Sequence, residues 1–531
     1  MSDQGKSKNS PVFTRRKFLK TSSASAAALM AFCALPGVSW SVENNILKVR
    51  TPFDIATFDP AFGSGPIELM VGSCIFNNLI TLEKEKSWVW KLEAAESMKQ
   101  LDPKRIEFRL MRGIMFTNGY GEMTAEDVKY SFHRIIDPKM KNPYAGDWAM
   151  LDHVEVKSKY VGIIHLKQAF APLWNIGLPG PTGLIYSKKA METVDGKMTV
   201  DPLACSGPYE LKEWKPKQVI ALKKNKLWKG DKAQFDEIQL FPIASDSTAQ
   251  AAFESGDIDF TVISASAYQS YGNKAPKNAR LLQYDSLFYS WLGINMENPM
   301  LTDIRVRKAI QMAVDVNAVV EAAYFGLTKP ATGAIPPGLI GHRGKSIIPP
   351  EGDIAGAKAL LAEAGYPNGI ELHLACLNNP GVVAQAQVIQ AFLGMAGIRI
   401  LIDQLDPGTF WVLGSDASLG EKANDVQLYL QRFSTFPDPS FAMQWFTSDQ
   451  VGVWNWERHR SAEFDKLNKQ ASEETDPAKR DKMYKRMQDI MELSGCYQFL
   501  AYEPIFALCR NTLDPQMRPD GYPAVRYFQK T

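Results

Sequence analysis

The chain has 531 residues, of which 45% are hydrophobic and 11% are aromatic, and its formal net charge is +2. A chain of this length exceeds a single hydrophobic core, so we expect at least two domains. Residues 1–41 carry six positive side chains and one negative side chain, and the net charge becomes −3 without them. That balance lacks the basic excess of a phosphate-binding surface, which argues against nucleic acid as a partner.

The first 41 residues are typical of an export signal. The motif TRRKFLK (14–20) precedes an uncharged, alanine-rich stretch (24–35) and a small-residue exit. The stretch is too short for a bilayer core, which needs about 20 apolar residues. Adjacent arginines followed by Phe-Leu resemble a twin-arginine signal. Because Phe32 is too bulky for a lipoprotein signal at Cys33, we expect cleavage near residue 41 and a periplasmic protein without a lipid anchor.

The rest of the chain alternates between strand and helix patterns, which predicts an α/β protein. Two segments have strand character, and three have helical periodicity. In chain order they are a strand at the start of 46–62, a helix in 122–138, two strands around a Lys-Pro-Lys turn in 206–228, and helices in 303–326 and 353–367.

The helix boundaries are signalled by capping residues. Thr124 and Asp127 have the spacing of a capping box at the start of the first helix. Gly326 is expected to end the second helix, and Asp353 and Gly365 are expected to begin and end the third.

Five cysteines follow the signal, and none has the C-x-x-C spacing of a zinc or redox site. Cys496 and Cys509 flank an apolar run that is able to turn back at Glu503-Pro504. An oxidising compartment would then allow a disulfide between them. The alternative is that all five cysteines are unpaired and buried.

The sequence lacks the usual motifs of catalysis. Its six histidines include no pair at the i, i+4 spacing of a helical metal site, and H-E-x-x-H and G-x-S-x-G motifs do not occur. Carboxylates are abundant, but no pattern pairs two of them for acid–base chemistry. We therefore expect a protein that is not an enzyme and that needs no cofactor.

Seven blocks, in this order, resemble the family 5 solute-binding proteins of ABC transporters, which include dipeptide, oligopeptide and nickel receptors. The blocks are TFDPAF, the segment from AAESMKQ to HRIIDP, SGPYELKEWKPKQ, AAFESGDIDF, INMENPMLTDIRVRKAIQMAVD, AKALLAEAGYP and FPDPSF. The resemblance covers nearly all of the mature chain. It implies a monomeric receptor that captures a peptide or other small solute and delivers it to permease subunits in the inner membrane.

The resemblance also implies a two-lobed periplasmic binding protein of type II, of the large class with an extra inserted domain, whose cleft closes about a hinge. One hinge strand is expected near 291–299 and the other near residue 504. The expected segments are the signal peptide 1–41, domain I in 42–85, 203–290 and 505–531, the inserted domain II in 86–202, and domain III in 291–504.

The ligand class is suggested by one departure from the family pattern. Peptide receptors of this family hold the peptide ammonium with an aspartate where this chain has Thr435. A neutral hydroxyl does not offset the desolvation of a buried ammonium, whereas the neighbouring Arg432 suits a carboxylate. The hypothesis is an anionic or zwitterionic solute, such as an opine-like or amino-acid-derived acid. Alternatively, the alignment slips here, or an acid elsewhere in the chain holds the amine.

Several aromatic residues lie where the family places its pocket. Trp454 and Trp456 alternate with Asn455, so an extended segment would direct both rings to one side. Trp291 and Phe433 are further candidates by position. The alternative for each aromatic residue is packing in the core.

Three other functions remain open: a chemosensory receptor, a secreted enzyme on the same scaffold, and a metal- or haem-binding protein. His459 is the only histidine near the expected pocket. A lone histidine between two arginines is more typical of a surface than of a metal site.

Overall fold

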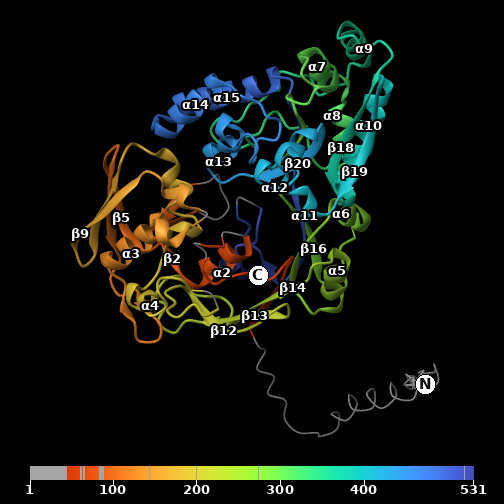
Figure 1. The fold of residues 1–531 in the computed structure, drawn as a ribbon. Helices are drawn as coiled ribbons and strands as arrows, with labels where there is room; N and C mark the ends of the chain where they lie inside the picture. The colour runs from red at the N-terminus through yellow and green to blue at the C-terminus, as the bar shows by residue number, and fades with distance from the viewer. Residues whose placement is uncertain are drawn as a thin grey trace, which may run out of the picture. The chain divides into compact units, whose positions relative to one another are not determined.

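The computed structural model describes residues 45–59, 62–63, 66–82, 89–142, 144–198, 200–272, 274–518 and 521–531. The predicted signal peptide, with its cleavage point near residue 41, lies outside the described residues. None of the helices in the described part has the length and apolar character needed to cross a bilayer. The described chain is organised around three large β-sheets (Figure 1).

The first sheet has seven strands in the order β12-β13-β14-β1-β15-β22-β16. Their bounds are β1 Ile46–Thr51, β12 Tyr209–Lys215, β13 Val219–Lys224, β14 Glu237–Pro242, β15 Phe260–Ile263, β16 Ala279–Tyr284 and β22 Ile505–Arg510. The predicted strand that begins at residue 46 is confirmed as β1, which pairs parallel with β14 and buries Leu47 and Val49 completely. The predicted strand pair in 206–228 is confirmed as the antiparallel pair β12 and β13.

The second sheet lies within 95–166 and has the order β5-β6-β10-β9. Its strands are β5 Ala95–Asp102, β6 Arg105–Leu110, β9 Leu151–Ser158 and β10 Val161–Leu166. The predicted helix is confirmed as α3 (Ala125–Ile136). Its capping box forms as expected: the Asp127 carboxylate accepts hydrogen bonds from the backbone N–H and the hydroxyl of Thr124, both at 2.8 Å. Val128 and Phe132 then pack into the core beneath this sheet.

The third sheet has five strands in the order β19-β18-β20-β17-β21. Its strands are β17 Phe288–Ile294, β18 Ile370–Leu377, β19 Ile398–Leu405, β20 Leu428–Ser434 and β21 Tyr497–Tyr502. The predicted helix in 353–367 is confirmed as α9 (Ile354–Glu363), with Asp353 as its N-cap. Helix α10 (Pro380–Met395) packs against β18 and β19.

The single helix predicted in 303–326 is wrong, because the structure has two helices there. They are α7 (Ile304–Ala313) and α8 (Val316–Tyr324). The break occurs at Val314, whose backbone is extended, and Asp315 caps the next helix through its carboxylate and the backbone N–H of Ala318 at 2.9 Å. A capping side chain inside a periodic apolar pattern therefore starts a new helix.

The chain passes between the first and third sheets in two short segments, 285–287 and 503–504. The expected hinge near residue 504 coincides with the second crossing. The expected hinge at 291–299 does not coincide with the first, because residue 291 lies in the middle of β17. The two crossings touch: the Ser286 hydroxyl donates to the Glu503 carbonyl at 2.6 Å, and the Glu503 N–H donates to the Phe288 carbonyl at 3.0 Å.

The disulfide alternative for Cys496 and Cys509 is wrong, because both are free, buried thiols. Strands β21 and β22 do follow one another across Glu503-Pro504, but they do not form a hairpin. Strand β21 pairs with β17 in the third sheet, whereas β22 pairs with β15 and β16 in the first. The other alternative is the one that the structure has: all five cysteines in the described part of the chain are unpaired and buried.

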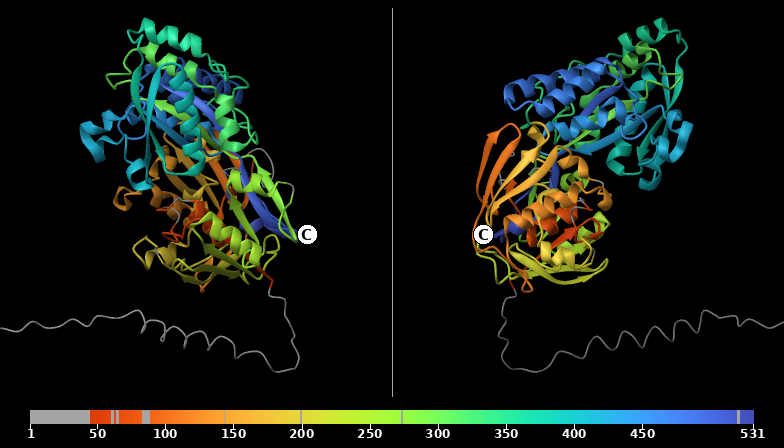
Figure 2. Two further views of the ribbon diagram at one scale, coloured as in Figure 1. Left: turned by 90° about the vertical axis from the view of Figure 1, so that its right-hand side faces the viewer. Right: turned by 60° about the vertical axis from the view of Figure 1, so that its left-hand side comes forward.

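The remaining helices cover the sheets and connect them (Figure 2). They are α2 Pro66–Ile75, α4 Lys188–Glu192, α5 Asp246–Ser255, α6 Ala265–Tyr271, α11 Pro407–Phe410, α12 Asp416–Leu419, α13 Pro439–Met443, α14 Ala462–Glu473 and α15 Pro477–Leu493. Short 3-10 turns that matter below are η2 Ala145–Trp148, η3 Ala171–Trp174, η4 Pro181–Gly183 and η6 Gln444–Phe446. Each of the three sheets is formed by segments of the chain that overlap one of the expected domains. The positions of the domain boundaries stay a prediction.

Candidate ligand-binding site

Six aromatic rings form a continuous line of contacts on the third sheet and its connecting loops. In order of contact they are Trp411, Phe433, Trp454, Trp445, Phe441 and Phe436, here called the aromatic row. Successive ring centroids lie 6.4, 6.1, 5.9, 5.3 and 4.5 Å apart. Trp411 and Trp454 are 38% and 37% exposed, and the other four rings are half-buried. A partly exposed line of aromatic rings is an unusual use of large apolar side chains in a soluble domain.

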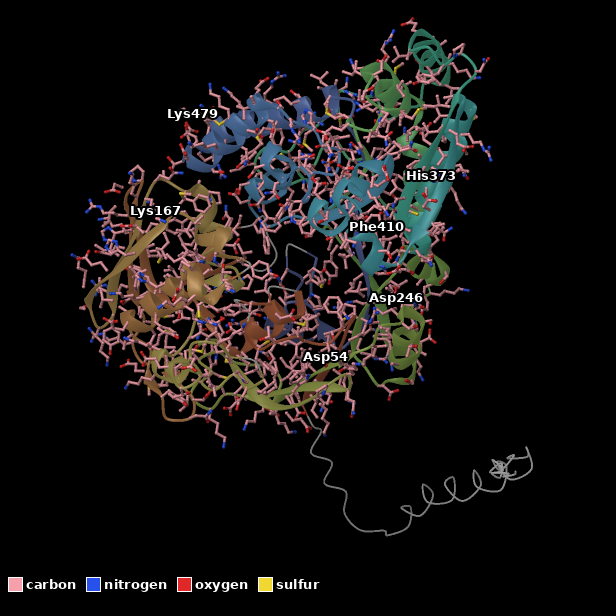
Figure 3. All side chains as sticks on the ribbon, viewed as in Figure 1. Asp54, Lys167, Asp246, His373, Phe410 and Lys479 are labelled. Carbon is pink, nitrogen blue, oxygen red and sulfur yellow. The ribbon has the colours of Figure 1, made fainter. Side chains whose placement is uncertain are left out.

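The row gathers residues from four separate places in the chain. Trp411 follows α11, whose Phe410 is labelled in Figure 3 on the side toward Asp246, the first residue of α5, and Asp54, which follows β1. Phe433 is the penultimate residue of β20. Phe441 lies in α13, which begins at Asp438, whose carboxylate accepts the Ser440 N–H at 3.0 Å.

Of the residues predicted from sequence, Phe433 and Trp454 lie in the row, and Trp291 lies directly beneath it. The Trp291 ring meets the Phe433 ring edge-on at 5.1 Å but is only 1% exposed. Its indole N–H donates to a carboxylate oxygen of Glu457 at 2.6 Å. Trp291 therefore supports the row from the core and has no exposed face in this structure.

The expectation that Trp454 and Trp456 face the same side is wrong. Residues 451–456 form a tight turn, closed by a bridge between Val451 and Asn455, instead of an extended segment. Trp454 consequently faces outward, while Trp456 is 2% exposed and packs against Phe410 and Tyr429. Alternation applies only where the backbone is extended.

Asn455 is fully buried and organises this turn. Its side-chain amide donates to the carbonyls of Phe446, Thr447 and His459 at 3.1, 3.1 and 2.8 Å, and its side-chain oxygen accepts the His459 N–H at 3.2 Å. The predicted hydrogen bond from Asn455 to a ligand is not possible in this conformation. Burial also lowers the pKa of His459 to about 4, so its imidazole is neutral at pH 7.

Thr435 is 1% exposed, and its hydroxyl donates to the Phe436 carbonyl at 3.2 Å. It therefore lies beneath the site surface, as a hydroxyl that already has an internal partner. Position 435 of this loop therefore carries no acidic side chain where peptide receptors of the family have an aspartate.

Arg432 lies on the opposite face of β20 from Phe433, because successive residues of a strand alternate. Its Nε and one Nη donate to the same Glu503 oxygen at 2.8 and 2.7 Å. Its guanidinium also lies 4.1 Å above the Phe288 ring. The side chain remains 37% exposed. The structure thus separates Arg432 from the aromatic row and places it beside both chain crossings.

Glu457 is a fully buried carboxyl under the row. Burial raises its pKa to about 7, and interactions with Tyr429 and Trp291 offset only part of that rise. No sequence pattern identified it, because a glutamate in VWNWERHR looks like one more charge on a loop surface. Trp411, Trp445, Phe436 and Phe441 were missed for a similar reason: only the tertiary fold joins them.

Comparison with known proteins places the chain in a family. The family model for bacterial extracellular solute-binding proteins, family 5 (middle), matches residues 90–453. The glutathione-binding protein GsiB of Shigella flexneri serotype 5b is 27% identical over 482 residues, covering 88% of this chain and 89% of that protein.

Solved structures show the same fold. The ABC transporter substrate-binding protein CtaP of Listeria monocytogenes superposes with a TM-score of 0.81 at 20% identity, covering 92% of this chain and 99% of that chain. DppA of Helicobacter pylori, in complex with the peptide STSA, superposes with a TM-score of 0.75 at 23% identity, covering 91% and 97%. These neighbours confirm the predicted two-lobed fold. The chain belongs to family 5 of the bacterial extracellular solute-binding proteins, the solute receptors of ABC importers.

Proposed function

We propose that this receptor binds a small zwitterionic solute, namely a short peptide or an opine-like or other amino-acid-derived compound, and delivers it to its permease unchanged. Family membership supports the receptor role and the permease partner. We further propose that the protein acts as a monomer in the periplasm after twin-arginine export and cleavage near residue 41. The paired arginines in TRRKFLK support that route.

The aromatic row is the observation that carries the proposed ligand class. Six contacting rings, two of them exposed and four half-buried, provide a surface for an apolar or planar body, as the linings of most small-molecule sites do. Phe433 and Trp454 are adjacent members of this row. The relative GsiB is named for glutathione, which is itself an amino-acid-derived zwitterion.

For the carboxylate end of the solute, Arg432 remains the proposed partner; because it lies on the face of β20 opposite Phe433, the solute would have to reach past the aromatic row to the chain crossings. Glu503 occupies its Nε and one Nη, so the other Nη is the group left for a ligand. Thr435 offers no charge to an ammonium group, and its hydroxyl is already bonded. A solute with at least one carboxylate fits these two observations better than a simple amine.

The direct test is to purify the protein gently from the periplasm and compare its native and denatured masses. The molecule released on denaturation is then identified. A single zwitterionic amino-acid-derived compound or a set of short peptides would support the proposal. A released sugar or a purely apolar compound would contradict it.

The role of Arg432 is tested by two variants with opposite expected effects. Arg432→Ala should weaken binding of the released solute at least tenfold, because one ionic hydrogen bond contributes about 1.5–3 kcal/mol. Glu503→Gln removes the competing carboxylate and should leave binding unchanged or make it tighter. If both variants weaken binding equally, Arg432 and Glu503 act together on the crossing, and Arg432 does not hold the solute.

A further inference from the structure

A cavity of about 430 Å³ lies at the end of the aromatic row. One wall comes from residues 144–181, around the second sheet, and the other comes from residues 436–472, which follow β20 and include α13 and most of α14. Its lining residues are Tyr144, Gly146, Asp147, Ala149, Phe170, Pro172, Ile176, Pro181, Phe436, Ser440, Phe441, Gln444, Trp445, Asn468 and Ser472. In Figure 1 and the right panel of Figure 2, α13 and α14 lie beside the part of the chain that holds β5 and β9.

Direct contacts join the two walls. Turn η3 packs against α14, and the Asn175 side-chain amide lies 3.5 Å from an Asp438 carboxylate oxygen. Asp438 is in turn held by Arg480 at 2.8 Å. A solute in this cavity would therefore touch two parts of the chain that are far apart in sequence.

Asp147 is the one side chain of formal charge among the residues that line the cavity. It lies on η2, and one of its oxygens accepts a hydrogen bond from the Thr182 hydroxyl at 3.0 Å. Among the described residues, none forms an ion pair with it. Burial raises the pKa of this carboxyl to about 6, and the Thr182 hydrogen bond lowers it only partly.

The other lining groups suit an organic cation. Tyr144 and Phe170 on one wall, and Phe436, Phe441 and Trp445 on the other, offer aromatic rings that attract cations. A single carboxylate among aromatic rings is a poor site for Mg²⁺ or Ca²⁺, which need several oxygen ligands.

We infer that this cavity binds an amine or guanidinium group, with Asp147 as its counter-charge and the aromatic side chains as its walls. The inference rests on the proposed function, since it supplies the cationic end of a zwitterionic solute. It also provides the charge that Thr435 lacks at the position where peptide receptors carry an aspartate. A cation bound between the two walls would favour the conformation in which they are in contact.

The test uses benzylguanidine, benzylamine and the uncharged benzyl alcohol as probes, with fluorescence of the lining Trp445 and saturation-transfer NMR as readouts. We expect both cations to bind wild-type protein at least tenfold more tightly than the alcohol. Asp147→Asn keeps the side-chain size and its acceptor oxygen for Thr182, and it should abolish this preference. Asp152→Asn, a matched change at an exposed carboxylate on β9, should leave the preference intact.

The pH dependence of cation affinity distinguishes direct binding by Asp147 from a purely structural role of this residue, because a structural role would not make the affinity follow the protonation of Asp147. Tyr144 is the other titratable residue in the lining. Cation affinity should be constant above about pH 7 and fall as the pH drops through 6, because protonation of Asp147 competes with the cation. The Asp147→Asn variant should show no such fall.

Equal binding of the alcohol and the cations, or a preference that survives in Asp147→Asn, would overturn the inference. The outcome is separate from the test of the proposed function. If the released solute carries no carboxylate but benzylguanidine binds as expected, the proposed function fails and the cation site stands. If a zwitterionic solute is released but Asp147→Asn retains the probe preference, only the cation site fails.

Discussion

Replacing Glu457 by glutamine should make the protein more stable, and increasingly so as the pH rises. Glu457 is fully buried, and its pKa is raised from the ordinary 4.5 to about 7. The folded state therefore holds the proton more tightly than the unfolded state does. The stability from this group is fully present below pH 4.5 and is lost as the pH rises through 7.

The size of the effect follows from the rise in pKa. Each pKa unit corresponds to about 1.4 kcal/mol, so a rise from 4.5 to about 7 is worth roughly 3 kcal/mol at pH 8. Glutamine has nearly the same shape, stays neutral, and retains an oxygen to accept the Trp291 indole N–H. Glu457→Gln should therefore exceed the free energy of unfolding of wild type by less than about 1 kcal/mol at pH 5 and by about 3 kcal/mol at pH 8.

Urea unfolding at pH 5, 6, 7 and 8, followed by tryptophan fluorescence, measures this difference. Subtracting the wild-type curve from the variant curve cancels the contributions of other titrating groups. Glu463→Gln is the matched control, since Glu463 is exposed and paired with Arg486, and its curve should stay parallel to wild type. A Glu457→Gln difference that is the same at pH 5 and pH 8 would refute the reasoning.

Two further predictions concern buried charge and thiols. Arg480→Ala should lower the free energy of unfolding by about 3–5 kcal/mol, because it leaves the fully buried Asp438 without its ion-pair partner. Arg305→Ala, at an exposed ion pair, is the control and should leave the free energy of unfolding unchanged. An equal loss of stability in both variants would contradict this prediction. Alkylation of the unfolded protein without reductant should modify both Cys496 and Cys509, and protection of either thiol until reductant is added would show a disulfide.

Local structure was largely predictable because it depends on neighbours in the sequence. The capping box of Thr124 and Asp127 and the N-cap Asp353 form as their spacing predicted. The hydrogen bonds involved join residues three positions apart, so no distant contact is needed to make them. The break between α7 and α8 has the same local basis, since the Asp315 carboxylate accepts the Ala318 N–H three residues on.

The site was only partly predictable. Family resemblance proposed Phe433 and Trp454, which lie in the aromatic row, together with Trp456, which packs in the core, and Arg432, which lies on the other face of β20. A tight turn decided the orientation of Trp456, and strand alternation placed Arg432 on the other face of β20. A motif shows which residues are close to one another in the sequence, whereas the exposure of each side chain depends on the backbone conformation.

The sequence by itself determined the family, the α/β class, several helix caps and three of the strands, since composition, periodicity and motif order are properties of neighbouring residues. Only the tertiary structure decided which groups meet. Asp147 and Trp445 line the same cavity because the stretches that hold them pack together. Cys496 and Cys509 stay apart because their consecutive strands pair with different sheets. Long-range pairing of strands creates these neighbours, and no local pattern encodes them.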